Sequence, residues 1–138
     1  YNMKSLKNNK STTKKSLLKQ KKDKILRQIR KICKKNPKIK PKIKKIKDLD
    51  RKLYYAQVWE VTESQSLNIL ENFDKRGWKN HHLDHIFPIY RGYLQNISPK
   101  RVGNIKNLQF IPFEENLSKG SQLTAESKNA LRRIKRLK

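Results

Sequence analysis

The residues between positions 81 and 119 have the types and order that hydrolytic chemistry requires. Asp84 stands beside His85, and two amides and an ammonium follow at Asn107, Asn116 and Lys119. Carboxylate and amide oxygens suit Mg²⁺ or Mn²⁺, which proteins hold with one or two groups together with water and a substrate phosphate. An imidazole outside the ligand set can take a proton from attacking water, because it titrates near neutral pH. These groups suffice for phosphodiester hydrolysis.

Each of these residues also has an ordinary structural explanation. An Asp–His pair is common in surface ion pairs and turns, and Asn107 could bond its own backbone before a strand. Asn116 and Lys119 could simply be solvated on a polar helix. Their order argues for a shared function, because a candidate group falls on each predicted element of one segment in a strongly basic chain.

The elements that must position these groups are two strands and a helix. A β-rich composition predicts a strand over residues 82–89, and a short apolar run predicts a second strand over 108–111. The loop between them contains two glycines and a proline. Residues 113–119, followed by Gly120, predict a short helix. We therefore expect a small α+β fold.

Helices are predicted on both sides of this segment. Thr62–Gln65 fits the capping-box pattern and predicts a helix that ends near Gly77. A last basic helix, capped near Thr124, is predicted from Ala125 towards Lys138. The apolar residues that these two helices should bury are Leu67, Leu70 and Phe73, and Leu131, Ile134 and Leu137.

Residues 1–53 are predicted to form a basic arm. Residues 1–50 hold 20 Lys and Arg against 3 Asp and Glu. Residues 1–15 are polar enough to be disordered without a partner. Apolar residues at three- and four-residue steps predict a helix with a basic face over 17–35, which Pro37 stops. Two interpretations stay open: an arm that binds a phosphate backbone through counterion release, or a solvated, repulsive tail.

The charge of the whole chain favours a polyanionic partner. The 138 residues carry a formal net charge of +25. No run approaches the roughly 18 apolar residues of a membrane span, and nothing resembles a secretory signal. We therefore expect an intracellular protein, in the cytoplasm or nucleoid of a host cell, with no membrane partner. Cys33 is the single cysteine, which excludes an intrachain disulfide and a zinc site built from paired cysteines.

Residues 81–120 resemble the HNH nucleases, which carry a ββα-metal finger. The resemblance is to the phage-type enzymes in particular, which include free-standing homing endonucleases. It is specific as a set, although each of its pieces is weak alone. Those pieces are His82-Leu83-Asp84-His85-Ile86, Ile97-Ser98-Pro99 through Gly103, Asn107-Leu108-Gln109 and Glu115-Asn116-Leu117-Ser118-Lys119.

The resemblance implies a role for each matched residue. It makes His85 the general base, and Asp84 with Asn116 the metal ligands. Asn107 would tie the loop to the strands and so hold the catalytic segment in place. Lys119 matches a basic residue that contacts phosphate near the scissile bond. The implied cofactor is Mg²⁺ or Mn²⁺ and the implied substrate is double-stranded DNA, with no small-molecule substrate.

The chain departs from the family pattern in its metal sites. Many members anchor the finger with cysteine-bound zinc, so here we expect no structural zinc and a finger held by packing. Asp84 and His85 also lie on adjacent residues, which face opposite sides of a regular strand. A bulge or strand end near His85 is therefore expected. The packing residues are expected to be Leu83, Ile86, Leu108 and Phe110, with neighbours such as Trp78.

The predicted organisation has three parts. They are a DNA-binding arm at 1–53, a nuclease domain at 54–124 with its ββα-metal core at 81–120, and a basic helix at 125–138. His82 fits the phage subgroup, where phosphate contact and packing are equally open roles. The expected DNA contacts are His82 and Lys119, together with Arg27, Arg30, Lys34, Lys35, Arg132 and Arg133.

Three functions are compatible with the sequence. The first is a metal-dependent DNA endonuclease, of the homing type among others, which nicks one strand or cuts both as a monomer or homodimer. The second is a non-catalytic nucleic-acid-binding protein, such as a chromatin-like or ribosomal component. The third is an inactivated HNH relative that keeps only the fold. The motif favours the enzyme, because a binding protein has no need of these groups in this register.

Overall fold

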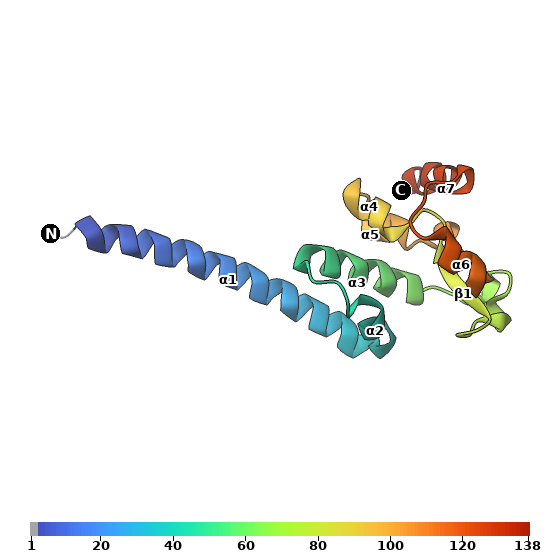
Figure 1. The fold of residues 1–138 in the computed structure, drawn as a ribbon, viewed down its shortest axis with the longest axis horizontal. Coiled ribbons are helices and arrows are strands. Elements are labelled where there is room, and N and C mark those ends of the chain that lie inside the picture. The colour runs from blue at the N-terminus through green and yellow to red at the C-terminus, as the bar shows by residue number, and fades with distance from the viewer. Residues whose placement is uncertain (1–2) are drawn as a thin grey trace. The chain divides into compact units, whose positions relative to one another are not determined.

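The computed structural model describes the backbone of residues 3–138 and the side chains from Thr13 onward (Figure 1). The chain divides into two compact units, Tyr1–Leu53 and Tyr54–Lys138. The second unit contains helices and a two-stranded antiparallel sheet, so the fold is α+β as predicted. None of the helices in residues 3–138 combines the length and the apolar character needed to cross a bilayer.

The first unit begins with one long helix, α1 (Met3–Lys35). The predicted disorder over 1–15 is wrong for residues 3–15, which are helical; Tyr1 and Asn2 lie outside the described residues. The stretch contains no glycine or proline, and its lysines and leucine are good helix formers. The predicted apolar stripe is buried only towards the end of α1, at Ile29 and Ile32, whereas Leu18 is 60% exposed.

The rest of the first unit folds back in short elements. α1 ends before Asn36, whose side-chain oxygen accepts a bond from the backbone of Lys38 at 3.2 Å. A 3₁₀ turn (Pro37–Ile39) and the short helix α2 (Lys40–Ile43) follow. Proline explains the break, because it disfavours helical geometry in the residue before it. The buried apolar side chains of this unit are Ile29, Ile32, Ile39 and Ile43.

Helix α3 (Leu49–Glu63) occupies part of the segment that was expected to cap a later helix. Thr62 lies inside α3, so the predicted capping box and the helix ending near Gly77 are wrong. Its hydroxyl is fully buried and donates to the carbonyl of Val58 at 2.8 Å, which removes it from a capping role. Two 3₁₀ turns, Leu67–Ile69 and Phe73–Lys75, replace that helix, with a left-handed Asn72 (φ 65°) between them.

The sheet pairs β1 (His81–His85) with β2 (Leu108–Pro112). The register is regular along the whole strand, from His81 opposite Pro112 to His85 opposite Leu108. The predicted second strand is thus confirmed, while the first is shorter than the predicted 82–89. The connection between the strands, predicted as a loop, contains α4 (Ile89–Leu94), α5 (Pro99–Val102) and a 3₁₀ turn (Ile105–Asn107).

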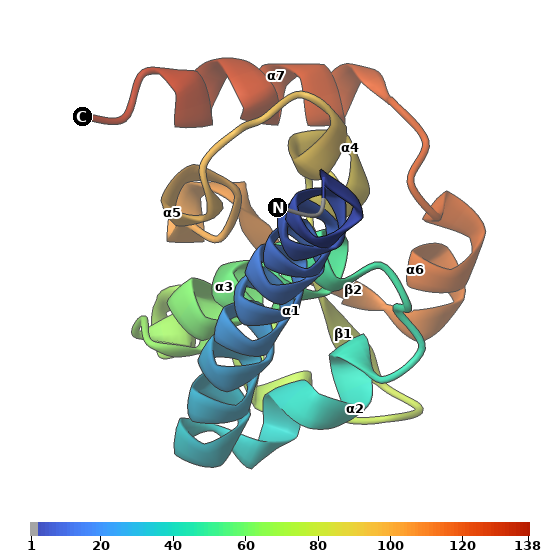
Figure 2. The same ribbon diagram turned by 90° about the vertical axis from the view of Figure 1, so that its left-hand side faces the viewer.

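The last two predicted helices are confirmed. α6 (Phe113–Lys119) follows β2 directly and ends at Gly120, whose φ is 55°. It packs against both strands, and Figure 2 shows it beside the sheet. α7 (Ala125–Lys135) begins with a capping box between Thr124 and Ser127. Its apolar face belongs to the core of the second unit, with Ile134 fully buried and Leu131 and Leu137 packed beside it.

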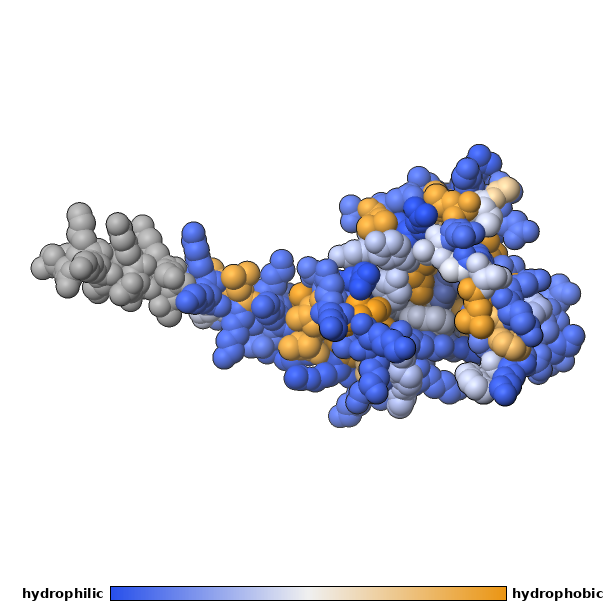
Figure 3. Space-filling view, in the orientation of Figure 1, coloured by the Kyte–Doolittle hydropathy of each residue, from blue (hydrophilic) through white to orange (hydrophobic). Residues whose placement is uncertain are grey.

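Two apolar clusters hold the second unit. One joins α3, α7 and the connection between the strands through Val58, Phe87, Ile89, Val102, Ala130 and Ile134. The other joins one face of the sheet to the segment after α3 through Leu67, Leu83, Leu108 and Phe110. Trp78 belongs to neither cluster and is 82% exposed, so the prediction that it helps to pack the finger is wrong. Hydrophilic residues cover most of the face drawn in Figure 3.

The connection between the strands approaches α3 closely. A Cβ built on Gly103 would lie 2.7 Å from the carbonyl oxygen of Val58, which is nearer than a carbon atom can sit. Tyr54 also joins α3 to the connection, because its hydroxyl donates to the carbonyl of Ile97 at 2.7 Å. Burial, and secondarily the neighbouring Tyr55, raise the pKa of Tyr54 well above its usual value, so it remains a donor at ordinary pH.

Candidate active site

The two faces of β1 carry different predicted site residues. His82 and Asp84 lie on the face that meets α6, where both contact side chains of that helix. Leu83 and His85 lie on the other face, where Leu83 joins the apolar cluster and His85 contacts Trp59 of α3. The structure therefore brings His82, Asp84, Asn116 and Lys119 to one side of the sheet and places His85 on the other.

Asp84 is held by two positively polarised groups. The ammonium of Lys119 lies 2.6 Å from its Oδ2, and the side-chain amide of Gln109 donates to the same oxygen at 2.9 Å. This ion pair is mostly buried, since the side chain of Asp84 is 8% exposed and that of Lys119 is 14% exposed. Within residues 13–138, no group hydrogen-bonds to Oδ1 of Asp84. The carboxylate is thus fixed in direction and keeps one oxygen for a ligand.

Lys119 also fixes the end of β1. Its ammonium donates to the carbonyl oxygens of His85 at 3.1 Å and Ile86 at 3.2 Å. An ammonium has three donors, and here all three reach the segment from Asp84 to Ile86. Lys119 is therefore an internal cation of the site. Its predicted contact with substrate phosphate stays a prediction.

Asn116 and His82 form a second polar group on the same face. The Nε2 of His82 lies 2.7 Å from the carbonyl oxygen of Trp78, and a carbonyl can only accept, so Nε2 carries the proton. Nδ1 is then an acceptor, and the amide nitrogen of Asn116 donates to it at 3.3 Å. Both nitrogens of His82 are engaged. The arrangement orients the amide of Asn116 and leaves its Oδ1 without a partner among the described side chains.

The pair of free oxygens fits a hard divalent cation. Asp84 offers Oδ1 and Asn116 offers its amide oxygen on the α6 side of the sheet, and these donor types suit Mg²⁺ or Mn²⁺. Residues 13–138 contain no group of three or more His, Cys, Asp and Glu side chains that could hold a metal. A cation held by these two side chains would therefore take its other ligands from water and substrate phosphate, as Mg²⁺ commonly does.

His85 is fixed from behind by α3. Its Nε2 lies 2.9 Å from the hydroxyl oxygen of Thr62, whose own proton is already donated to Val58. Thr62 must then accept, so Nε2 of His85 carries the proton and Nδ1 is the basic nitrogen. The ring also meets Trp59 edge to face, with 4.8 Å between centroids. Of the two predicted alternatives near His85, the strand end is confirmed, because β1 ends at His85. The bulge is not found, because pairing is regular up to His85 opposite Leu108.

Thr62 is the site residue that the sequence did not reveal. It lies 23 positions before His85, and its capping-box spacing pointed to a different role. Gln109 was quoted as part of a motif but was given no role, although its position opposite Asp84 follows from the strand register. One signal for Thr62 was usable. The apolar pattern of residues 49–61 predicts a helix, and a threonine one turn after Val58 lies on the same face of that helix.

Asn107 braces the segment after β1, as predicted. Its side-chain oxygen accepts from the backbone nitrogen of Phe87 at 2.7 Å, and its nitrogen donates to the carbonyls of Phe87 at 3.1 Å and Val102 at 2.7 Å. The side chain is fully buried and completely satisfied on these partners. It therefore ties the connection to the end of β1, next to His85, and has no free atom for a substrate.

The six predicted DNA-contacting Lys and Arg residues that lie outside residues 81–120 are all exposed. Four of them lie on α1 in the first unit and two on α7 in the second. Arg132 bonds Asn129 on its own helix at 3.2 Å, and Arg133 reaches the carbonyl of Lys106 at 3.4 Å. The exposed cations on α1 are Arg27, Arg30, Lys34 and Lys35. Two of them, Arg30 and Lys34, line a cavity of about 360 Å³ together with Ile29, Cys33 and Ile43.

Comparison with known proteins identifies no relative. The chain matches no protein-family model, no curated protein and no solved structure.

Proposed function

We propose that the chain is a metal-dependent endonuclease of the HNH type that hydrolyses phosphodiester bonds in double-stranded DNA. One observation carries the proposal: Asp84 and Asn116 present unpartnered oxygens on the α6 face of the sheet, next to Gln109 and Lys119. The order of elements, strand, strand and helix, matches the order expected of the motif. The net charge of +25 supports a polyanionic substrate.

Asp84 and Asn116 would hold Mg²⁺ or Mn²⁺. A cation bound there supplies positive charge that stabilises the leaving oxygen and orients the phosphate. Gln109 and Lys119 hold the Asp84 carboxylate in one orientation, and His82 does the same for the Asn116 amide. Such outer partners typically change metal affinity or activity by about 10- to 100-fold when removed.

His85 is the proposed general base. Thr62 fixes its proton on Nε2 and so makes Nδ1 the nitrogen that takes a proton from water. His82 is the other nearby imidazole, but both of its nitrogens are already engaged by Trp78 and Asn116. Because His85 and Asp84 lie on opposite faces of β1, the proposal requires the phosphate to lie across the end of the strand, where the two faces meet.

One observation favours a second candidate, an inactivated finger that only binds DNA. The ammonium of Lys119 neutralises Asp84 at 2.6 Å, which is an arrangement that needs no metal. The basic residues on α1 and α7 would serve either function equally well.

Plasmid nicking separates the two functions. Supercoiled plasmid incubated with the full chain and Mg²⁺ should become nicked or linear, and EDTA should abolish this. The His85→Ala variant should also lose cleavage while it still binds the plasmid. Intact plasmid at saturating protein, across Mg²⁺ and Mn²⁺ concentrations, would leave only the binding function.

A further inference from the structure

The exposed ring of Trp78 has no structural role in the described part of the chain. Trp78 is 82% exposed, although an aromatic ring of this size is normally buried for most of its area. The other tryptophan, Trp59, packs against both apolar clusters. The ring of Trp78 instead lies against the Lys79 ammonium, 5.1 Å from its centroid. Folding therefore does not account for an aromatic residue at this position.

The backbone that carries Trp78 is firmly held. Gly77 donates to the carbonyl of His81 at 3.1 Å, and Asn80 donates back to the carbonyl of Gly77 at 3.1 Å. Phe113, the first residue of α6, donates to the carbonyl of Asn80 at 2.9 Å. The ring is thus presented to solvent from a closed turn that is bonded to both β1 and α6, which lowers the entropy lost when it binds a ligand.

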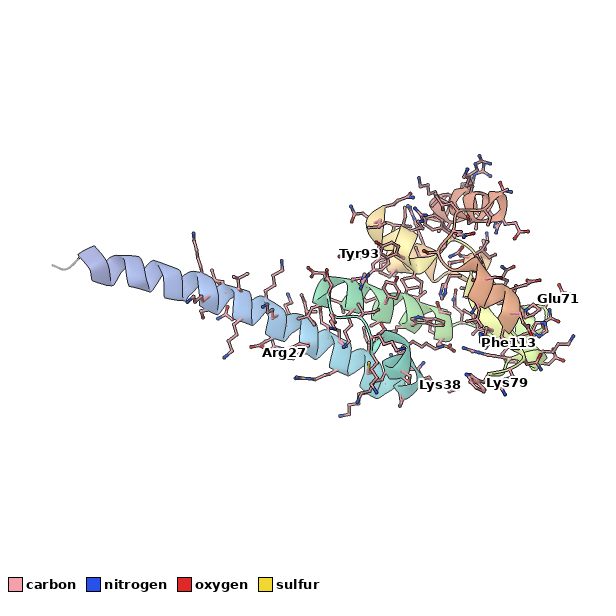
Figure 4. The ribbon with its side chains drawn as sticks, viewed as in Figure 1. Arg27, Lys38, Glu71, Lys79, Tyr93 and Phe113 are labelled. Atoms are coloured by element: carbon pink, nitrogen blue, oxygen red, sulfur yellow. The ribbon has the colours of Figure 1, made fainter. Side chains whose placement is uncertain are left out.

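Trp78 is also connected to the candidate active site. Its carbonyl oxygen accepts the Nε2 proton of His82 at 2.7 Å, and His82 in turn accepts from Asn116. Figure 4 shows the labelled Lys79 on the turn and the labelled Phe113 at the start of α6, in the same part of the second unit. A strand whose phosphate reaches Asn116 would pass this turn.

We propose that Trp78 is a stacking site for a nucleobase of the bound strand. An unpaired or unstacked base stacks on the face of the indole ring. Such stacking tolerates any sequence, because every base has a π-face. Lys79 adds a positive charge beside the ring that can meet the phosphate of the same nucleotide. The inference rests on the proposed nucleic-acid substrate, but it requires no cleavage.

Binding measured in EDTA tests the inference apart from catalysis. The probes are a labelled single-stranded 15-mer of thymidines and an oligomer of equal length and charge built from abasic units. The full wild-type chain should bind the thymidine oligomer more tightly. Trp78→Ala should weaken that binding by roughly 5- to 150-fold, the effect of losing one stacked base, and should leave the abasic oligomer nearly unchanged. Trp78→Phe, which keeps an aromatic face, should restore most of the affinity.

Ile69→Ala is the matched control, because Ile69 is also an exposed apolar residue, at 72%, and should not affect either probe. Equal wild-type affinity for the two probes, or the same loss for Trp78→Ala on both, would overturn the inference. Binding of anionic lipid vesicles that depends on Trp78, without any preference for bases, would also overturn it and assign the ring to a membrane surface. Base-dependent binding by a chain that never cleaves DNA would support the stacking site and contradict the proposed endonuclease function.

Discussion

The two faces of the β1–β2 sheet are built from alternate residues of the same strands but have opposite character. The face towards α6 is polar and charged, with Asp84, Gln109 and Lys119 in contact. The face towards α3 is mostly apolar, and His85 lies there beside Leu83, Leu108 and Phe110. Strand alternation thus separates the proposed metal ligands from the proposed base.

The difference shows two ways of fixing a functional side chain. On the polar face a carboxylate is held by an ion pair and an amide, which are groups that a divalent cation can rearrange. On the apolar face an imidazole is held by a buried hydroxyl and an aromatic ring, which fix its proton and its orientation. The ligand side is therefore adaptable, whereas the base side is rigid.

Removal of the imidazole on the apolar face should have the largest effect on cleavage. His85→Ala should lower the rate by roughly 10²- to 10⁴-fold, the usual contribution of general base catalysis, with DNA affinity retained. His82→Ala should lower it by only about 10- to 100-fold, since His82 acts through Asn116. His81→Ala is the control, because the His81 ring bonds to the side chain of the adjacent Asn80 and was given no role in the site. If plasmid nicking shows a larger loss of rate for His82→Ala than for His85→Ala, the general base is His82, on the polar face.

Loss of the internal cation should reveal how adaptable the polar face is. Lys119→Met leaves Asp84 mostly buried without its ion-pair partner, so we expect a loss of roughly 2–4 kcal/mol in the free energy of unfolding. Mg²⁺ should restore part of this stability, because a divalent cation can replace the ammonium. Thermal unfolding with and without Mg²⁺ measures both effects, with the exposed Lys128→Met as control. A stability loss that Mg²⁺ leaves untouched would argue against a cation at Asp84.

Loss of the buried hydroxyl should test the rigidity of the apolar face. Thr62→Val keeps the shape but removes the acceptor of the His85 Nε2 proton, so cleavage should fall by about 10- to 100-fold. Stability should fall by about 1–3 kcal/mol as well, because a buried donor loses its partner. Thr62→Ser should restore activity. Nitrogen NMR of the His85 ring reports its tautomer directly. If the His85 ring of the Thr62→Val variant stays protonated on Nε2, Thr62 does not determine the tautomer.

The exposed cations should affect binding alone, and least of all. Replacing Arg27, Arg30, Lys34 and Lys35 by Gln should flatten the slope of log K against log salt by up to about 3.6, at about 0.9 for each phosphate contact. The matched change of Arg132 and Arg133 should flatten it by up to about 1.8. An unchanged slope for the first variant would show that the cations of α1 form a solvated tail.

The sequence predicted the second strand and the last two helices of the second unit because their signals are local. The strand at 108–111, the helix at 113–119 ended by Gly120, and the capped helix from Ala125 all follow from short-range rules. The bracing role of Asn107 came from the resemblance, and its bonds to Phe87 and Val102 agree with it.

The sequence failed where long-range contacts decide. The hydroxyl of Thr62 bonds within α3 and also to His85, 23 positions away, and no local pattern reveals the second of these bonds. The bonds of Lys119 were not predicted either, because its long side chain reaches back from α6 to Asp84, His85 and Ile86. Trp78 was expected to help pack the finger, whereas its turn is closed by backbone bonds that do not need the ring.

The most direct test of the central claim is a count of bound metal. The His85→Ala chain, held on uncleaved duplex DNA, can be titrated with Mn²⁺ while electron paramagnetic resonance measures the free ion. We expect about one bound Mn²⁺ per chain that depends on the Asp84 and Asn116 oxygens, and we expect this binding to be lost when Asp84→Ala is added. Equal Mn²⁺ binding by the chains with Asp84 and with Asp84→Ala, or no Mn²⁺ binding by the chain that keeps Asp84, would contradict the claim that these two side chains form a cation site.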